Sequence, residues 1–278
     1  MPHARMAALQ GFYDMSFYYY QKRLLRDFTN LSMLFRRNYD GHIVSMHQAG
    51  THWLRNLLTH VIAREYQLPI PDNIRSNAIV GGPNRIPTHR GPHIVQSHKI
   101  PGPLFSLPLW RHLLKFPKYL VLVRDPRVST ASHYKKHGKE SPKRFSEFLR
   151  NRGGDEHFMK DIWDDIRFLN VWVPLAQNWP EQVKLVRYED LRNDTAATLQ
   201  AIADFFGIAL QADTLGWSIE QCSKETMSGR EDASRRFKVV REDEDDPLAI
   251  YSEADKAYFL DTYRRHLKTA IPYDLNKW

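Results

Sequence analysis

The residues whose types and spacing could do chemistry begin in the segment 47–53, which reads His-Gln-Ala-Gly-Thr-His-Trp. An apolar run, 42–46, precedes it, and leucine, valine and isoleucine recur at helical spacing over 51–66. A loop between a strand and a helix presents unpaired N–H groups and the positive end of the helix dipole to an anion. Gly50 allows close backbone approach and the Thr51 hydroxyl adds a donor, so the segment predicts a phosphate-binding loop; the alternative is an ordinary helix start capped by Thr51.

This segment differs from a Walker A loop, which needs two glycines and a Gly-Lys-Ser/Thr ending. It has one glycine and no lysine. The sequence therefore disfavours an ordinary NTPase and a P-loop kinase that acts on a small molecule.

A second pair of polar residues follows another apolar run, 119–123. Arg124 comes directly after the run, Pro126 suits a first helical turn, and Ser132 lies about two turns further on. An arginine fork and a hydroxyl can together hold a phosphate. The alternative is a surface Arg–Asp pair beside a helical serine.

The elements that must position these residues alternate between strands and helices. Such alternation predicts an α/β fold with a central parallel sheet flanked by helices, whose ligands lie at the carboxyl ends of the strands. The expected strands are 42–46, 93–97, 119–123 and 183–188, and the expected helices are 51–66, 156–178, 194–206 (with Gly207 as C-cap) and 253–267. Long loops are expected over 69–92 and 230–248.

The composition favours anionic ligands and gives no sign of a membrane span. The chain has 278 residues, a net charge of +8 and one cysteine, Cys222, so an internal disulfide is excluded and a cytoplasmic location is expected. Residues 1–41 read as an aromatic and basic helical extension before a single domain, 42–278. The extension could pack on that domain or make a peripheral membrane contact.

Taken in order, these segments resemble the cytosolic-type sulfotransferases, which use 3′-phosphoadenosine 5′-phosphosulfate (PAPS) and release 3′,5′-ADP. The family's first loop, Tyr-Pro-Lys-Ser-Gly-Thr-Thr-Trp, corresponds to Met46–Trp53. Its Arg-Asn/Asp-Pro motif with a serine eight residues later corresponds to Arg124 and Ser132. Three further matches are Ser97-His98, Tyr188-Glu189-Asp190-Leu191 and Cys222-Ser223-Lys224-Glu225-Thr226-Met227.

The resemblance implies a P-loop NTPase-like sulfotransferase fold and a role for each matched residue. His98 would be the general base. The first loop would bind the 5′-phosphosulfate, with Trp53 stacked on the adenine, Tyr188 in contact with it, and Ser223 lining the pocket. Arg124 and Ser132 would hold the 3′-phosphate, aided by Arg235 and Arg236 in place of the family's distal Arg-Lys-Gly. The cofactor-binding set is thus His47, Gln48, Ala49, Gly50, Thr51, His52, Trp53, Arg124, Ser132, Tyr188, Ser223, Arg235 and Arg236.

Gln48 is the main departure, because the family usually has a lysine there, directed at the leaving-group oxygen. Gln48 can donate a hydrogen bond but carries no charge. Lys99, His47 or His52 could supply a cation instead, the enzyme could be slower, or the chain could bind nucleotide without turnover. We count His98, Gln48 and Lys99 as the candidate catalytic residues, and expect no metal.

The acceptor cannot be read from the sequence beyond a small molecule with a hydroxyl or amine, including glycan-like and lipid-like compounds. A nucleic-acid partner is not expected, because the basic residues are spread along the chain. The family often dimerises through a short segment, which Phe237-Lys238-Val239 matches in part, so monomer and homodimer both stay open.

Overall fold

Four parallel strands form the centre of the protein, in the order β2-β1-β3-β4. They are β1 (Gly41–Ser45), β2 (Ile94–Ser97), β3 (Lys118–Val123) and β4 (Val183–Arg187). The computed structural model describes residues 39–82, 88–101, 117–138, 141, 143–151, 160–231, 239 and 246–278. The predicted strands are confirmed, with one difference: Tyr188 begins a helix instead of ending β4.

The register brings the strand ends to one edge of the sheet. Ser45 pairs with Leu122, Val44 with Ser97, and Val123 with Arg187. The segments after β1, β2, β3 and β4 therefore leave the sheet side by side, as expected for ligand-binding α/β proteins.

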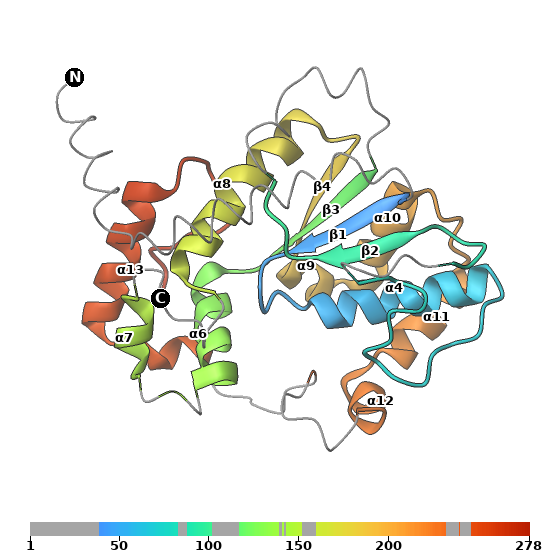
Figure 1. Ribbon diagram of the computed structural model, residues 1–278, viewed down its shortest axis with the longest axis horizontal. Helices are drawn as coiled ribbons and strands as arrows, with labels where there is room; N and C mark the ends of the chain where they lie inside the picture. The colour runs from blue at the N-terminus through green and yellow to red at the C-terminus, as the bar shows by residue number, and fades with distance from the viewer. Residues whose placement is uncertain are drawn as a thin grey trace.

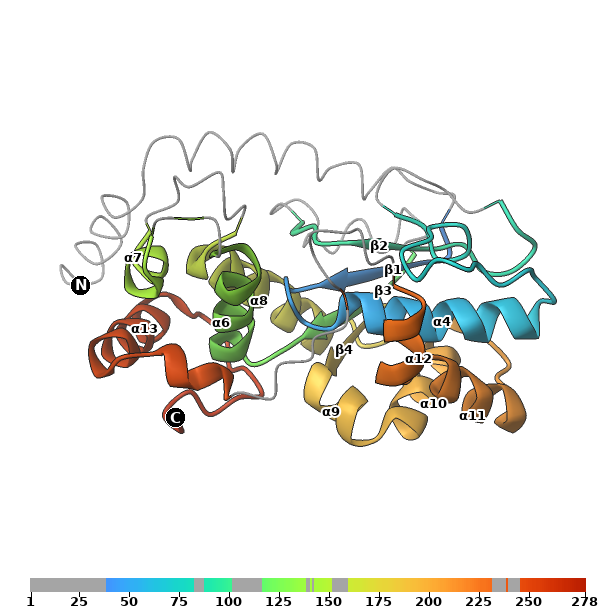
Figure 2. The same cartoon turned by 90° about the horizontal axis from the view of Figure 1, so that it is seen from below.

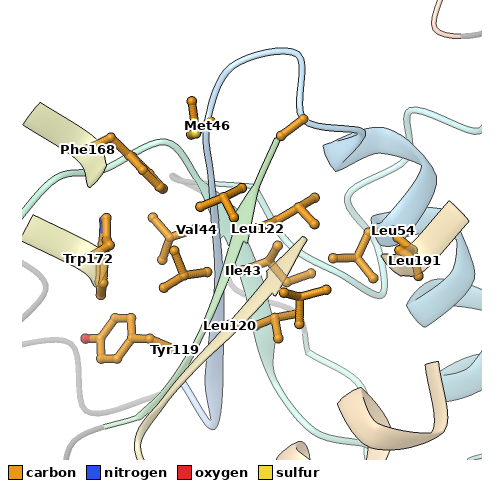
Figure 3. Close-up of a cluster of buried hydrophobic side chains, with 14 of the residues drawn as sticks. Ile43, Val44, Met46, Leu54, Tyr119, Leu120, Leu122, Phe168, Trp172 and Leu191 are labelled. Atoms are coloured by element: carbon orange, nitrogen blue, oxygen red, sulfur yellow. The ribbon is translucent and has the colours of Figure 1, made fainter. Parts of the chain in front are cut away.

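Helices cover both faces of the sheet. Helix α8 (Ile162–Asn178) packs Phe168 and Trp172 on one face, while Leu54 and Leu191 lie on the other (Figure 3). The second face is covered by α4 (Thr51–Glu65), α9 (Tyr188–Asn193), α10 (Thr195–Phe206) and α11 (Ala212–Gln221), and α12 (Lys224–Gly229) follows α11 (Figure 1).

A separate group of helices lies beyond the carboxyl edge. Both views place α6 (Pro126–His137), α7 (Phe145–Leu149) and α13 (Glu253–His266) together there (Figures 1 and 2). The 3-10 helix η3 (Pro247–Ile250) precedes α13 and packs on α6. This group forms one wall beside the loop that follows β1.

The predicted helices are largely confirmed. Gly207 ends α10 in the left-handed conformation, with φ 75°. Helix α8 begins at Ile162, because Asp161 caps it by accepting the N–H groups of Trp163 and Asp164. The expected loop 69–92 holds no helix or strand in its described part, although Gly81 bridges to Val95 beside β2. Residues 1–38 of the expected extension, 156–159 of the expected helix and most of the expected loop 230–248 lie outside the described residues.

Trp172 tests how much the α8 face contributes to stability. It is fully buried and tilts against Tyr119 at a ring-centroid distance of 5.4 Å. We expect Trp172→Ala to lower the free energy of unfolding by about 3–5 kcal/mol, as large-to-small core substitutions do. Urea denaturation monitored by circular dichroism measures this.

The matched control is Ile70→Ala, because Ile70 is 41% exposed. Its expected effect is below about 0.5 kcal/mol. Equal losses in the two variants would contradict the assignment of Trp172 to the core.

Candidate functional site

The loop after β1 makes a tight, left-handed entry into α4. Gly50 has φ 83° and is the N-cap of α4, and Gln48 also has a positive φ of 58°. A Cβ at Gly50 would lie 2.5 Å from the Tyr188 ring. Both the conformation and the contact therefore require glycine at this position.

The first turn of α4 has no side-chain cap among the described residues. Gly50 is the N-cap and Thr51 is the first helical residue, so the alternative of a helix start capped by Thr51 is wrong. Instead the Thr51 hydroxyl lies 2.7 Å from Ser45 Oγ. An uncapped N-terminus on a 15-residue helix leaves backbone N–H groups and a positive dipole available to an anion.

Arg124 joins this loop to the end of β4. Its guanidinium donates to the Gln48 carbonyl at 2.9 Å and lies 4.5 Å from the centroid of the Tyr188 ring. Burial lowers its pKa, opposed by the nearby Tyr188 and Glu189. An arginine remains charged under these conditions, so a cation is held beside the loop.

Two aromatic rings lie on the same side of the loop. Trp53 and Tyr188 are arranged edge to face, with centroids 6.1 Å apart. Trp53 Nε1 donates to the Cys222 carbonyl at 3.1 Å, which places Ser223 next to the same wall. The structure thus brings together residues from three distant segments that the sequence assigned to one nucleotide pocket.

The remaining predicted phosphate contacts have different outcomes. Ser132 is buried on α6. Ser223 caps α12, accepting the Thr226 N–H at 3.2 Å. Arg230, in the same region of the chain as Arg235 and Arg236, contacts His60 Nε2 and donates to the Pro71 carbonyl, at 3.0 and 2.7 Å. Arg235 and Arg236 lie outside the described residues.

His98 leaves the end of β2 and is fixed at the end of β1. Its Nδ1 donates to the Ser45 carbonyl at 2.8 Å, and Ser45 Oγ lies 3.2 Å away. A carbonyl only accepts, so Nδ1 carries the proton and the neutral ring keeps its lone pair on Nε2. The side chain is exposed, which leaves it accessible to a second molecule.

The surroundings of His98 favour its neutral form. Partial loss of hydration lowers its pKa first, the Ser45 carbonyl opposes this, and the charges of Lys160 and Lys136 lower it further. A neutral imidazole at physiological pH is the form that accepts a proton.

The three suggested replacements for a lysine at position 48 lie in different surroundings. His52 is neutral, because burial and surrounding cations lower its pKa to about 3. His47 stacks on His98 at 4.2 Å between ring centroids. Lys99 accepts a hydrogen bond from Trp172 Nε1 through its carbonyl, which fixes the backbone after His98. His52 is therefore ruled out as the cation.

A buried polar network behind the loop has no counterpart among the residues predicted from the sequence. Ser129 Oγ donates to the His47 carbonyl, Lys160 Nζ donates to Ser129 Oγ, and Lys160 pairs with Asp165, each at 2.7 Å. Burial raises the pKa of Asp165 to about 6, and the ion pair with Lys160 opposes this rise. Lys160 lies just before α8 in the chain, so no local pattern could have indicated its contact with α6.

The tail of the chain also supports the site. Tyr273 donates to Glu189 at 2.8 Å, and the other Glu189 carboxylate oxygen accepts the Asp125 N–H at 3.1 Å. Glu189 therefore ties the end of β3 to the segment that carries Tyr188. No sequence signal placed Tyr273 here.

Several other kinds of site find no support. The Cys222 thiol is buried and its pKa is raised to about 12, so it is not a ready nucleophile. No cluster of His, Cys, Asp or Glu suited to a metal occurs in the described ranges. No helix in that part of the chain has the length and apolar character needed to cross a bilayer. An apolar hollow of about 530 Å³ lies at the outer edge of β4, and none of Gly50, Arg124, Tyr188 and His98 lines it.

Known proteins resemble this chain over most of its length. Mouse Sulfotransferase 2A2 is 23% identical over 81% of this chain and 77% of its own, and mouse Sulfotransferase 2A1 is 24% identical over 81% and 78%. The crystal structure of mouse sulfotransferase SULT7A1 complexed with PAP superposes with a TM-score of 0.58, at 15% identity, over 86% of this chain and 88% of that one.

Retinol dehydratase, solved with androsterone and the inactive cofactor PAP, gives a TM-score of 0.56 at 15% identity, over 89% of this chain and 88% of that one. At such identities the structures establish a shared fold. Residues 39–246 match the Sulfotransferase domain family. The chain therefore belongs to this family.

Proposed function

We propose that this chain transfers a sulfuryl group from PAPS to a hydroxyl of a small-molecule acceptor, with His98 as general base. The observation that carries the proposal is the convergence of the Gly50 loop, Arg124 and Tyr188 at the sheet edge where His98 leaves β2. These residues could hold a nucleotide that carries a second phosphate, and they place it next to His98 as the general base.

The described residues fit a nucleotide with two anionic ends. The uncapped N-terminus of α4, with Gly50, Thr51 and His52, suits the 5′-phosphosulfate. Arg124 with Ser132 suits a 3′-phosphate, since a guanidinium binds phosphate through paired hydrogen bonds. Trp53 and Tyr188 supply faces for adenine. The solved relatives contain PAP, which is another name for 3′,5′-ADP, and this supports the choice of nucleotide.

The proposed step is an in-line displacement at sulfur. The acceptor oxygen forms a bond to sulfur while the bond between sulfur and the 5′-phosphate oxygen breaks. His98 Nε2 takes the proton of the acceptor hydroxyl, and the electron pair of the broken bond stays on the leaving 5′-phosphate, giving 3′,5′-ADP. Catalysis then depends on positioning and on stabilising negative charge at that oxygen.

A solved relative indicates one class of acceptor. Retinol dehydratase was solved with retinol and with androsterone, and both are apolar alcohols. An exposed His98 beside a sheet edge is compatible with such a compound. A cytoplasmic location, a peripheral membrane contact through residues 1–41, and a monomeric or homodimeric state stay predictions.

A second candidate function is nucleotide binding without turnover. Gln48 favours it, because its amide carries no charge for the leaving group. A small-molecule kinase is less favoured, since the loop lacks the lysine of a Walker A motif.

Arg124 tests the proposed nucleotide. A native-state ligand raises the thermal midpoint, so we expect 3′,5′-ADP to stabilise the protein more than ATP or 5′-AMP. Arg124→Met should raise the Kd for 3′,5′-ADP about 10–100-fold, the value of a lost charged hydrogen bond. It should weaken binding of 5′-AMP much less, because 5′-AMP lacks the 3′-phosphate.

Arg265→Met is the control, because Arg265 pairs with Asp261 on the exposed side of α13. It should leave the preference for 3′,5′-ADP intact. Stabilisation of the wild type by ATP alone would overturn the choice of nucleotide.

His98→Ala should lower kcat about 10²–10⁴-fold, the usual contribution of a positioned base. Binding of 3′,5′-ADP should be kept. In the wild type, kcat/KM should be constant above about pH 6.5 and fall as pH falls through the lowered pKa of His98, because protonation removes the base. Radiolabelled sulfate transfer measures both effects.

His93→Ala serves as the matched control at the other end of β2, where His93 Nε2 contacts the His89 carbonyl. Near-normal turnover in His98→Ala would refute the role of His98.

Gln48→Lys should retain sulfuryl transfer and leave kcat equal or higher, since it restores a charge-assisted donor. The same transfer assay measures it. Loss of activity in this variant, with 3′,5′-ADP binding intact, would show that this loop needs an uncharged residue at position 48.

A further inference from the structure

The loop after β1 has no lysine at position 48 to place a positive charge near the leaving phosphate. Negative charge develops on the leaving oxygen, and a neutral amide at Gln48 stabilises it less than a cation would. His52 does not supply this charge, because it is neutral at physiological pH. A cation from elsewhere in the fold is a further source, beside His47 and Lys99.

Helix α6 presents one face to the loop of Gln48. Ser129 Oγ donates to the His47 carbonyl at 2.7 Å, and the His133 ring lies edge to face with the His47 ring at 5.9 Å. His47 in turn stacks on His98 at 4.2 Å. Residues three, four and seven positions apart share a helix face, so Lys136 lies on the face that Ser129 and His133 define.

Lys136 differs from Ser129 and His133 in its reach. Those two side chains are buried against the loop, whereas Lys136 is half-buried, one turn beyond Ser132. A long lysine chain at that place can extend its ammonium group from the helix toward the space beside the loop.

Electrostatics supports the same position. Several cationic side chains lie near enough to lower the pKa of His52 or His98, and among the described lysines and arginines only Lys136 acts on both. His52 follows Gln48 by four residues, and His98 is fixed to the Ser45 carbonyl and stacks on His47, so a charge that acts on both histidines lies near the Gln48 loop.

Three other cations, Arg55, Arg75 and Lys160, each act on only one of these two histidines. Arg55 donates to Asn77 and the Ile74 carbonyl, at 3.0 and 2.8 Å. Arg75 pairs with Glu231 at 3.3 Å. Lys160 is buried in its ion pair with Asp165, at 2.7 Å.

We propose that Lys136 supplies the positive charge that stabilises the transferred sulfuryl group and the leaving 5′-phosphate, in place of the charge that Gln48 lacks. This inference rests on the proposed sulfuryl transfer. It assigns a catalytic residue that comes from α6 instead of the loop after β1.

The test is charge rescue in the full-length protein. We expect Lys136→Met to lower kcat about 10²-fold, the loss typical of one stabilising donor. Adding Gln48→Lys to that variant should restore most of the loss, whereas Gln48→Lys in the wild type should change kcat little. Lys136→Arg should keep most activity, and Lys135→Met, on a different face of α6, should be unchanged.

A second measurement does not depend on turnover. In NMR titrations of the nucleotide-free protein, Lys136→Met should raise the pKa of His98, because the Lys136 charge lowers it. Lys136→Gln replaces Lys136→Met if the latter does not fold.

The outcomes separate this inference from the function on which it rests. If the wild type is active, any one of three results refutes the role of Lys136 alone. Lys136→Met is as active as the wild type, Gln48→Lys does not restore the activity of Lys136→Met, or the His98 pKa is unchanged in Lys136→Met. A wild type that binds 3′,5′-ADP but transfers no sulfuryl group to any acceptor refutes the proposed transfer, and the role of Lys136 falls with it.

Discussion

The contact between Gly50 and the Tyr188 ring holds the two halves of the site together. A side chain at Gly50 would occupy the space of that ring, and the left-handed backbone there turns the chain into α4. Arg124 lies on the Tyr188 ring and also holds the Gln48 carbonyl. Contacts within the protein thus fix the loop after β1, the end of β3 and the start of α9 relative to one another. Such preorganisation reduces the ordering cost of binding an anion.

The position of His98 depends on the short distance between the ends of β1 and β2. Because these strands pair in parallel, the Ser45 carbonyl meets His98 Nδ1 and leaves the basic lone pair on Nε2. Behind the loop, the buried pair of Lys160 and Asp165 supports Ser129, which holds the His47 carbonyl. A buried ion pair of this kind is weak evidence for stability, but it does fix the position of the groups bonded to it.

Physical patterns in the sequence predicted the fold and the edge of the sheet at which the site residues lie. Nearly continuous apolar runs such as Tyr119–Val123 are typical of strands buried on both faces, and parallel strands bring the loops after them to one edge of the sheet. It missed α11, which contains Gly216 and whose two buried residues, Thr214 and Ser218, are polar. It also placed Tyr188 in a strand, because β-branched and aromatic residues run up to it without a break.

By itself, therefore, the sequence predicted the four strands and most of the helices around them, and it indicated the loop with Gly50 as a candidate anion-binding loop. The resemblance paired Arg124 with Ser132 and singled out His98. Tertiary structure decided the features that depend on long-range distance: the proton position on His98 set by Ser45, the uncharged state of His52, and the support given by Lys160 and Tyr273. The physical reason is that local patterns record burial and periodicity, whereas hydration, charge and hydrogen-bond partners depend on which distant segments meet.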